Sequence, residues 1–150
     1  MKNLKFNILA VMIVTSFCGS GQSLKVETLN QDPEKIIKSY FDGWVKKDWT
    51  LVAVQLADGF TFTSPSPDDH ITIEKFKAKC WVQAEHIQRF DFIKIVGNEH
   101  EAFAIIHVIT NENKIIRNTE YFTFEKGKIK SIEVFFGGSG LGFPTNVKQP

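Results

Sequence analysis

Three side chains in this 150-residue chain stand out as candidates for proton chemistry, namely Tyr40, His107 and Glu120. Glu120 alternates with Phe122 and Phe124 along the run NTEYFTFE. A carboxyl group among phenylalanines is costly to ionise, so it needs a partner or a purpose. A tyrosine hydroxyl and a protonated acid can donate hydrogen bonds, and a histidine can accept a proton near neutral pH. These three residues are the candidates for catalysis.

Each candidate also has a purely structural interpretation. Tyr40 could be a core tyrosine with a satisfied hydroxyl. Glu120 could hydrogen bond to Tyr40 or to a backbone amide. His107 could be a hydrogen-bonded core histidine or part of a dimer interface. The chemical interpretation requires Tyr40 and Glu120 to face one cavity, where a hydrogen bond between them would sustain a raised Glu120 pKa.

Glu120 lies on the first strand of a predicted β-hairpin. Residues 118–124 and residues 131–136 each alternate between two faces, which is the period of a β-strand. Between them, Gly127 can take a positive φ without steric penalty in a turn at residues 125–128. The hairpin fixes the face on which Glu120 lies.

Helices are predicted before the strands. Asp32 and Pro33 are an N-cap and a first helical residue, and Asp48 caps a shorter helix that ends at Asp58-Gly59. A third helix follows a proline-containing loop at residues 64–69. The apolar stripe of the first helix is Ile36, Ile37, Tyr40, Phe41, Trp44 and Val45, and that of the third is Ile73, Phe76, Cys80, Trp81, Ala84 and Ile87.

Further strands are predicted at residues 60–63, 88–96 and 101–110, with Asn- and Gly-containing turns between the later ones. Helices gathered before a run of antiparallel strands predict an α+β fold with the helices on one face of the sheet. A bent sheet closed by helices leaves a conical hollow in which a small ligand could bind. The candidate ligand-binding residues are Trp44, Phe62, Ser64, Trp81, Phe122 and Phe136.

Composition excludes several classes of partner. The chain has 18 basic and 17 acidic residues and no basic stripe, so nucleic acid is not an expected partner.

We also predict no metal site and no cofactor. Cys80 would be the one thiol left in the mature chain. His70 and the two aspartates beside it in the sequence lack the convergence of a metal site. The glycine-rich tail at residues 138–150 precedes no helix and is no phosphate-binding loop.

The N-terminus has the pattern of a secretory signal peptide at residues 1–21. Lys2 and Lys5 precede a short apolar run, and small residues follow it. The run is too short to span a bilayer as a mature helix. We therefore expect a periplasmic or secreted protein, and lipid attachment at Cys18 is the less favoured alternative.

Residues 32–137 resemble the NTF2-like superfamily, in the style of SnoaL-like and ketosteroid-isomerase-like domains. The resemblance rests on IIKSYFDGWVKKD, on QLADGFTFTSP and on EYFTFEKGKIKSIEVFFG. It implies an NTF2-like cone, with three N-terminal helices packed on a curved antiparallel sheet. The superfamily includes isomerases, cyclases, hydrolases and domains without catalysis, so the resemblance predicts fold better than activity.

The ketosteroid isomerase pattern carries over in part. Tyr40 falls where that family has its oxyanion-hole tyrosine, and Glu120 falls where it has a protonated aspartic acid. The family's general base would lie just before Pro65, where this chain has Ser64, which cannot act alone as a base. The resemblance turns the His107 face toward the cavity, so His107 is the reserve proton acceptor.

Two functions of different classes follow. The first is binding, with or without turnover, of a small hydrophobic molecule in the cone cavity. The second is a non-catalytic homodimeric interaction domain with a packed cavity. Relatives commonly pair through the outer sheet face, and Ile106 and Val108, opposite the His107 face, are expected to be covered by a partner. An open cavity with converging polar groups would favour the first function.

Overall fold

The computed structural model describes residues 32–65 and 68–136, so the predicted signal peptide, Cys18 and the glycine-rich tail lie outside the described residues. The elements are, in order, α1 (Pro33–Val45), α2 (Trp49–Ala53), β1 (Leu56–Thr63), β2 (Ile71–Thr72), α3 (Ile73–Lys79), the 3-10 helix η1 (Trp81–His86), β3 (Ile87–Gly97), β4 (Glu101–Thr110), β5 (Ile115–Glu125) and β6 (Lys128–Phe136).

The first helix, α1, forms as its sequence predicts. The Asp32 side chain accepts a hydrogen bond from the Glu34 backbone N–H, and Pro33 occupies the first turn, where its missing N–H costs nothing. The residues buried on its inner face are Ile36, Ile37, Tyr40, Phe41, Gly43 and Trp44. This stripe places Tyr40 and Trp44, four residues apart, on the side that faces the sheet, whereas Val45, which was predicted to belong to it, is exposed.

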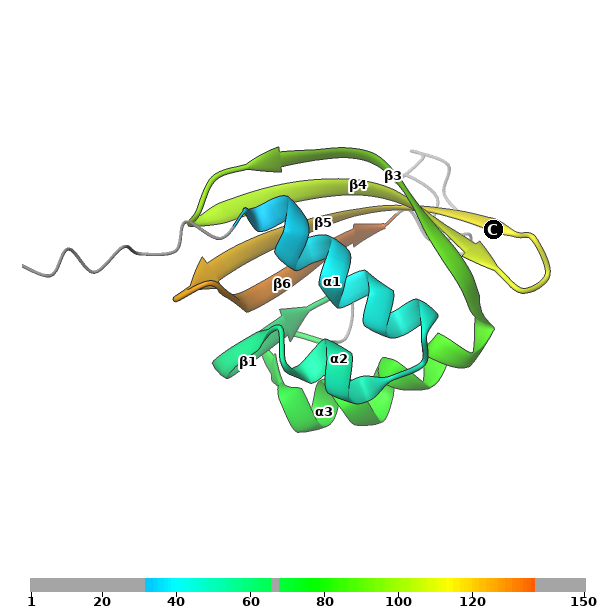
Figure 1. Ribbon diagram of the computed structural model, residues 1–150. Helices are drawn as coiled ribbons and strands as arrows, with labels where there is room; N and C mark the ends of the chain where they lie inside the picture. The colour runs from blue at the N-terminus through cyan, green and yellow to red at the C-terminus, as the bar shows by residue number, and fades with distance from the viewer. Residues whose placement is uncertain (1–31, 66–67, 137–150) are drawn as a thin grey trace, which may run out of the picture.

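Six strands form one curved sheet in the order β2-β1-β6-β5-β4-β3. Figure 1 shows α1 lying across the concave side of this sheet, with α2 and α3 grouped beside β1. Strand β3 carries register shifts between Ile87 and Arg89 and between Phe92 and Lys94. Such bulges increase local bend and twist, which helps the sheet to wrap around the helix.

The expectation of an antiparallel sheet is wrong at one position, because β1 and β6 are parallel. The other neighbouring strands pair antiparallel. Strand alternation fixes which face a residue occupies but not the direction of a partner that is distant in the chain. Only a short turn, such as that between β5 and β6, dictates an antiparallel pair.

The three predicted helices are only loosely matched. The second, α2, is five residues long, and β1 begins at Leu56 inside the range predicted as helix. Gly59, expected to end that helix, instead lies within β1 with a φ of 68°. The third predicted helix changes at Cys80 from α3 to the 3-10 helix η1.

The core lies between α1, α3 and the concave face of the sheet. Its largest fully buried side chains are Phe76, Phe122, Ile37, Ile106, Ile129, Ile132 and Val52. Aromatic rings bring much of this apolar surface, which is consistent with a fold that has no disulfide among its described residues. Within the described ranges, no helix combines the length and apolarity needed to cross a membrane.

Candidate functional site

A cavity of about 490 Å³ lies between α1 and the concave face of the sheet. This volume is in the range of small-molecule pockets. Six of its lining residues are aromatic, namely Tyr40, Phe41, Trp44, Phe62, Phe76 and Phe90. Gln83 and His86, which also line it, are exposed on η1 and therefore form part of its rim.

Glu120 reaches this cavity from β5. Alternation along the strand puts its side chain on the same inner face as Phe122 and Phe124, as predicted, and it is 7% exposed. Burial raises the Glu120 pKa to about 8, and a hydrogen bond from Asn118 opposes that rise. The acid is consequently neutral at pH 7 and can donate a hydrogen bond.

Tyr40 reaches the same cavity from α1. Its ring packs edge-on against Phe41, Trp44 and Phe122 and is almost fully buried. Burial, and then the nearby Glu120, raise the pKa of Tyr40 well above its usual value. Its hydroxyl therefore stays protonated and is a hydrogen-bond donor.

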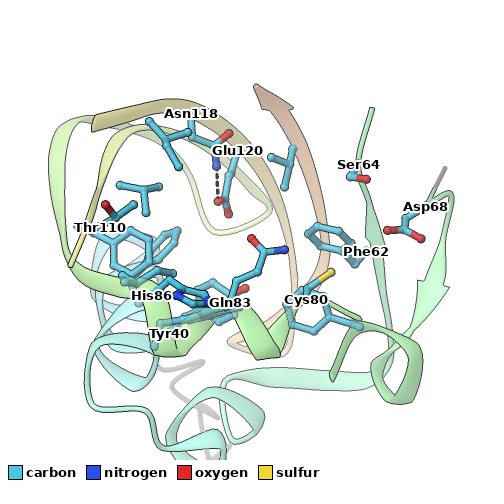
Figure 2. A pocket seen from close by; sticks show the side chains of 18 residues that line it. Tyr40, Phe62, Ser64, Asp68, Cys80, Gln83, His86, Thr110, Asn118 and Glu120 are labelled. Atoms are coloured by element: carbon cyan, nitrogen blue, oxygen red, sulfur yellow. Dashed lines mark hydrogen bonds between the residues drawn. The ribbon is translucent and has the colours of Figure 1, made fainter. Parts of the chain in front are cut away.

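Tyr40 and Glu120 are not hydrogen bonded to each other, contrary to expectation. Asn118 Nδ2 instead donates to Glu120 Oε1 at 2.8 Å. Figure 2 shows Asn118 and Glu120 on one side of the cavity and Tyr40 on the other. Because Asn118 is two residues before Glu120, the two share a strand face, and the carboxyl group finds a partner on its own strand.

Asn118 is a polar cavity residue that was not predicted from the sequence. It lines the cavity, and its Oδ1 is buried without a hydrogen-bond partner in the described part of the chain, as is Trp44 Nε1. Trp44 lies close enough to the Tyr40 hydroxyl to oppose the rise in its pKa, although no hydrogen bond of normal geometry joins the two. The signal for Asn118 was present, since it begins the alternation that contains Glu120.

His107 does not face the cavity, which corrects the prediction that it is the reserve base. The inner face of β4 carries Ala102, Ala104 and Ile106, each at most 1% exposed. His107 lies on the opposite face, where Asp91 of β3 and Arg117 of β5 are its neighbours in the strand register. The prediction failed because the larger apolar side chains that alternate with His107 on β4 are on the outer face.

The predicted ligand-binding residues divide into three groups. Trp44, Phe62 and Ser64 line the cavity. Trp81 and Phe122 do not, because Trp81 packs against two other tryptophan rings and Phe122 is fully buried in the core. Phe136 ends β6, and its side chain lies outside what the structure describes.

Other polar residues at the cavity were not predicted as ligand-binding. Cys80 and Asp68 line it near Ser64, and Thr110 lines it on β4. Burial, and then Asp68, raise the pKa of the Cys80 thiol to about 11, so the thiol is protonated at neutral pH and is a weak nucleophile. In the described part of the chain, no three His, Cys, Asp or Glu side chains come together to hold a metal ion.

Known structures share this architecture. A protein from Kribbella flavida superposes with a TM-score of 0.62 at 16% identity, over 69% of this chain and 84% of its own. An NTF2-like protein from Cytophaga hutchinsonii gives 0.55 at 18% identity, over 71% and 90%. The chain has the NTF2-like fold. A protein from Jannaschia sp. CCS1, described as a SnoaL-like polyketide cyclase, gives 0.56 at 13% identity, over 68% and 83%.

The NTF2-like fold was thus predicted correctly from the three short motifs. No protein-family model matches the chain, and no curated protein matches it either. Sequence identities this low show that the fold is shared, but they do not show that an activity is shared. The residues that line the cavity are therefore the evidence for its function.

Proposed function

We propose that this domain binds a small, mostly apolar molecule in the cavity and holds a polar oxygen of that molecule with Tyr40 and Glu120. The observation that carries the proposal is that these two buried donors line one open cavity of about 490 Å³. The alternative of an interaction domain with a packed cavity requires this space to be filled by side chains. The open cavity favours ligand binding.

The same arrangement has a chemical consequence. If one ligand oxygen lay within hydrogen-bond reach of both, the two neutral donors would stabilise negative charge that develops on it, as in an oxyanion hole. Turnover would also require a proton acceptor, and neither Ser64 nor the outward-facing His107 supplies one. His86, at the rim, is the histidine that lines the cavity. Binding is therefore the activity that the geometry supports directly, and turnover would need Asp68, His86 or a group of the ligand as the proton acceptor.

Ligands that co-purify with the protein test this proposal. Native mass spectrometry of gently purified protein should show a bound small molecule, which denaturation releases for identification. Tyr40→Phe and Glu120→Gln should each lower its occupancy. A wild-type protein that carries no ligand and also fails to bind neutral ring compounds would contradict the proposal.

We also propose that the domain forms a homodimer through the outer face of its sheet. The expectation that Ile106 and Val108 need a partner is wrong, since their side chains face inward. Exposed apolar residues of the outer face include Val96, Phe103, Ile105 and Phe135, which are neighbours in the strand register. A surface of this kind is typical of an interface. Light scattering should give a dimer mass for the wild type and a monomer mass for Ile105→Lys.

Export remains a proposal that rests on the sequence pattern of residues 1–21. N-terminal sequencing of the mature protein should find a start near residue 22. Protein that retains Met1, or that carries a lipid on Cys18, would contradict cleavage at this place.

A further inference from the structure

Two carboxyl groups and no permanent cation are found among the described residues that line the cavity. Asp68 and Glu120 line it, with His86 at the rim, whereas no lysine or arginine of the described residues does so. The remaining titratable groups that line it are Tyr40 and Cys80, whose raised pKa values keep both protonated at neutral pH. The described lining therefore offers no permanent positive charge to an anionic ligand.

Two lysines near the lining are already engaged. Lys47 Nζ donates to the backbone oxygens of Ala84 and Ile87 at 2.9 and 3.0 Å. Lys79 pairs with Asp68, whose side chain is 14% exposed. Each ammonium group would have to leave its present acceptors before it could bind an anion in the cavity.

The protonation state of Glu120 determines the electrostatic cost of binding an anionic ligand. While it is protonated, a ligand carboxylate would lie in an apolar space with hydrogen-bond donors but no counter-ion, which is costly. Once it is ionised, the same ligand would meet a second negative charge. A neutral oxygen avoids both costs, because protonated Glu120 or Tyr40 can donate a hydrogen bond to it.

The aromatic walls limit the shape of the rest of the ligand. Rings from α1, β1, α3 and β3 surround the cavity, including Phe41, Phe62, Phe76 and Phe90. Flat ring systems make stacked and edge-on contacts with such walls.

We infer that the cavity selects an uncharged ring compound with a carbonyl or hydroxyl oxygen, and that it rejects carboxylates, phosphates and sulfates. The inference rests on the proposed binding function and adds the charge class of the ligand. The juxtaposition that carries it is a buried pair of neutral donors, Tyr40 and Glu120, in an aromatic cavity without a free cation among its described lining residues.

Three probes that share one ring system test the inference. 2-Acetylnaphthalene is neutral, 2-naphthoate is an anion and 2-(aminomethyl)naphthalene is a cation near neutral pH. Calorimetric titration of the wild-type protein, at a pH below the Glu120 pKa, should show the ketone binding at least about 10-fold more tightly than either charged probe, a difference of about 1.4 kcal/mol.

A pair of matched variants tests the cause. Gln83→Lys adds an ammonium group at an exposed position that lines the cavity. It should raise the affinity for 2-naphthoate by about 10-fold or more, since it supplies the missing counter-ion. Val82→Lys adds the same charge at the neighbouring exposed position, which does not line the cavity, and should leave that affinity nearly unchanged.

The outcomes separate the two proposals. If no probe binds and no small molecule co-purifies, the proposed function is wrong, and the charge class with it. If no probe binds but a small molecule co-purifies, the inferred ligand class is wrong while ligand binding stands. If 2-naphthoate binds the wild type as tightly as the ketone, the charge class is wrong while ligand binding stands. If the ammonium probe binds most tightly, a carboxylate of the lining, Asp68 or Glu120, acts as its counter-ion, and the uncharged class is likewise overturned.

Discussion

Asn118 Nδ2 donates a 2.8 Å hydrogen bond to the Glu120 carboxyl group from two residues earlier on the same strand. The bond favours the ionised form of the acid, whereas burial disfavours it more strongly, and the pKa settles at about 8. The cavity thus holds an acid whose protonation can change within the physiological pH range.

Removing the Asn118 amide should raise the Glu120 pKa further, because only burial would then act on it. Asn118→Leu is expected to move the titration midpoint above about 8, as followed by the carboxyl carbon signal in NMR. Thr119→Ala, one residue along on the opposite strand face, is the control and should leave the midpoint in place. A midpoint that falls in Asn118→Leu would show that the amide does not stabilise the ionised acid.

Glu120 should also make stability depend on pH. Its pKa is about 8 in the folded protein against an ordinary value of 4.5, so the folded state binds the proton more tightly. The contribution of this group is most favourable below about pH 4.5, falls as the pH rises toward 8, and is constant above that range. Urea unfolding of wild type and Glu120→Gln across pH 4–9 should show the variant gaining relative stability over this window. Parallel curves would indicate that Glu120 is not desolvated.

Ligand affinity should depend on Tyr40 and Glu120, which face the cavity, and not on His107, which faces away from it. Tyr40→Phe and Glu120→Gln should each weaken binding of 2-acetylnaphthalene, with the loss of one hydrogen bond costing about 0.5–1.5 kcal/mol. His107→Gln should leave the affinity unchanged, because His107 is on the outer face of β4. Circular dichroism should confirm that all three variants are folded. Loss of binding in His107→Gln would contradict the assigned face.

Gly43 on α1 should tolerate no larger side chain. A Cβ atom there would lie 2.7 Å from Val52 Cγ2 and 2.9 Å from the Val52 backbone nitrogen, and the backbone atom cannot rotate away. Alanine normally stabilises a helix relative to glycine, but here Gly43→Ala should lower the free energy of unfolding by about 1–3 kcal/mol. Ser39→Ala, exposed on the same helix, is the control and should change it by less than about 0.5 kcal/mol. A stabilised Gly43→Ala would show that α1 and α2 pack less closely.

The sequence predicted best those features that depend on local spacing. The α1 stripe, the turn at Gly127 and the inward side of Glu120 all follow from residues within a few positions of one another. The outer face of β4 was misassigned because both of its faces are apolar. Ala102 and Ala104 face inward opposite Phe122 and Glu120 in the strand register, so the small residues sit beside the large ones.

The missed features depend on contacts between distant parts of the chain. Nothing local to His86 or Gln83 indicates that η1 lies at the rim of a cavity. The role of Asn118 required knowing that its amide turns toward Glu120 rather than toward solvent. A sequence pattern gives the face of a strand, but the partner of a polar group is set by three-dimensional packing.

The parallel pairing of β1 with β6 has a kinetic consequence. Phe62 of β1 pairs with Ile132 of β6, seventy residues later, and the Gln55 backbone oxygen accepts from Ile129 N–H. Contacts so distant in sequence raise the contact order and slow folding. Until β6 has been synthesised, one edge of β1 has no partner, and an unpaired edge strand is prone to associate with other chains. The closing hairpin is therefore the step that ends the aggregation-prone phase of this chain's synthesis.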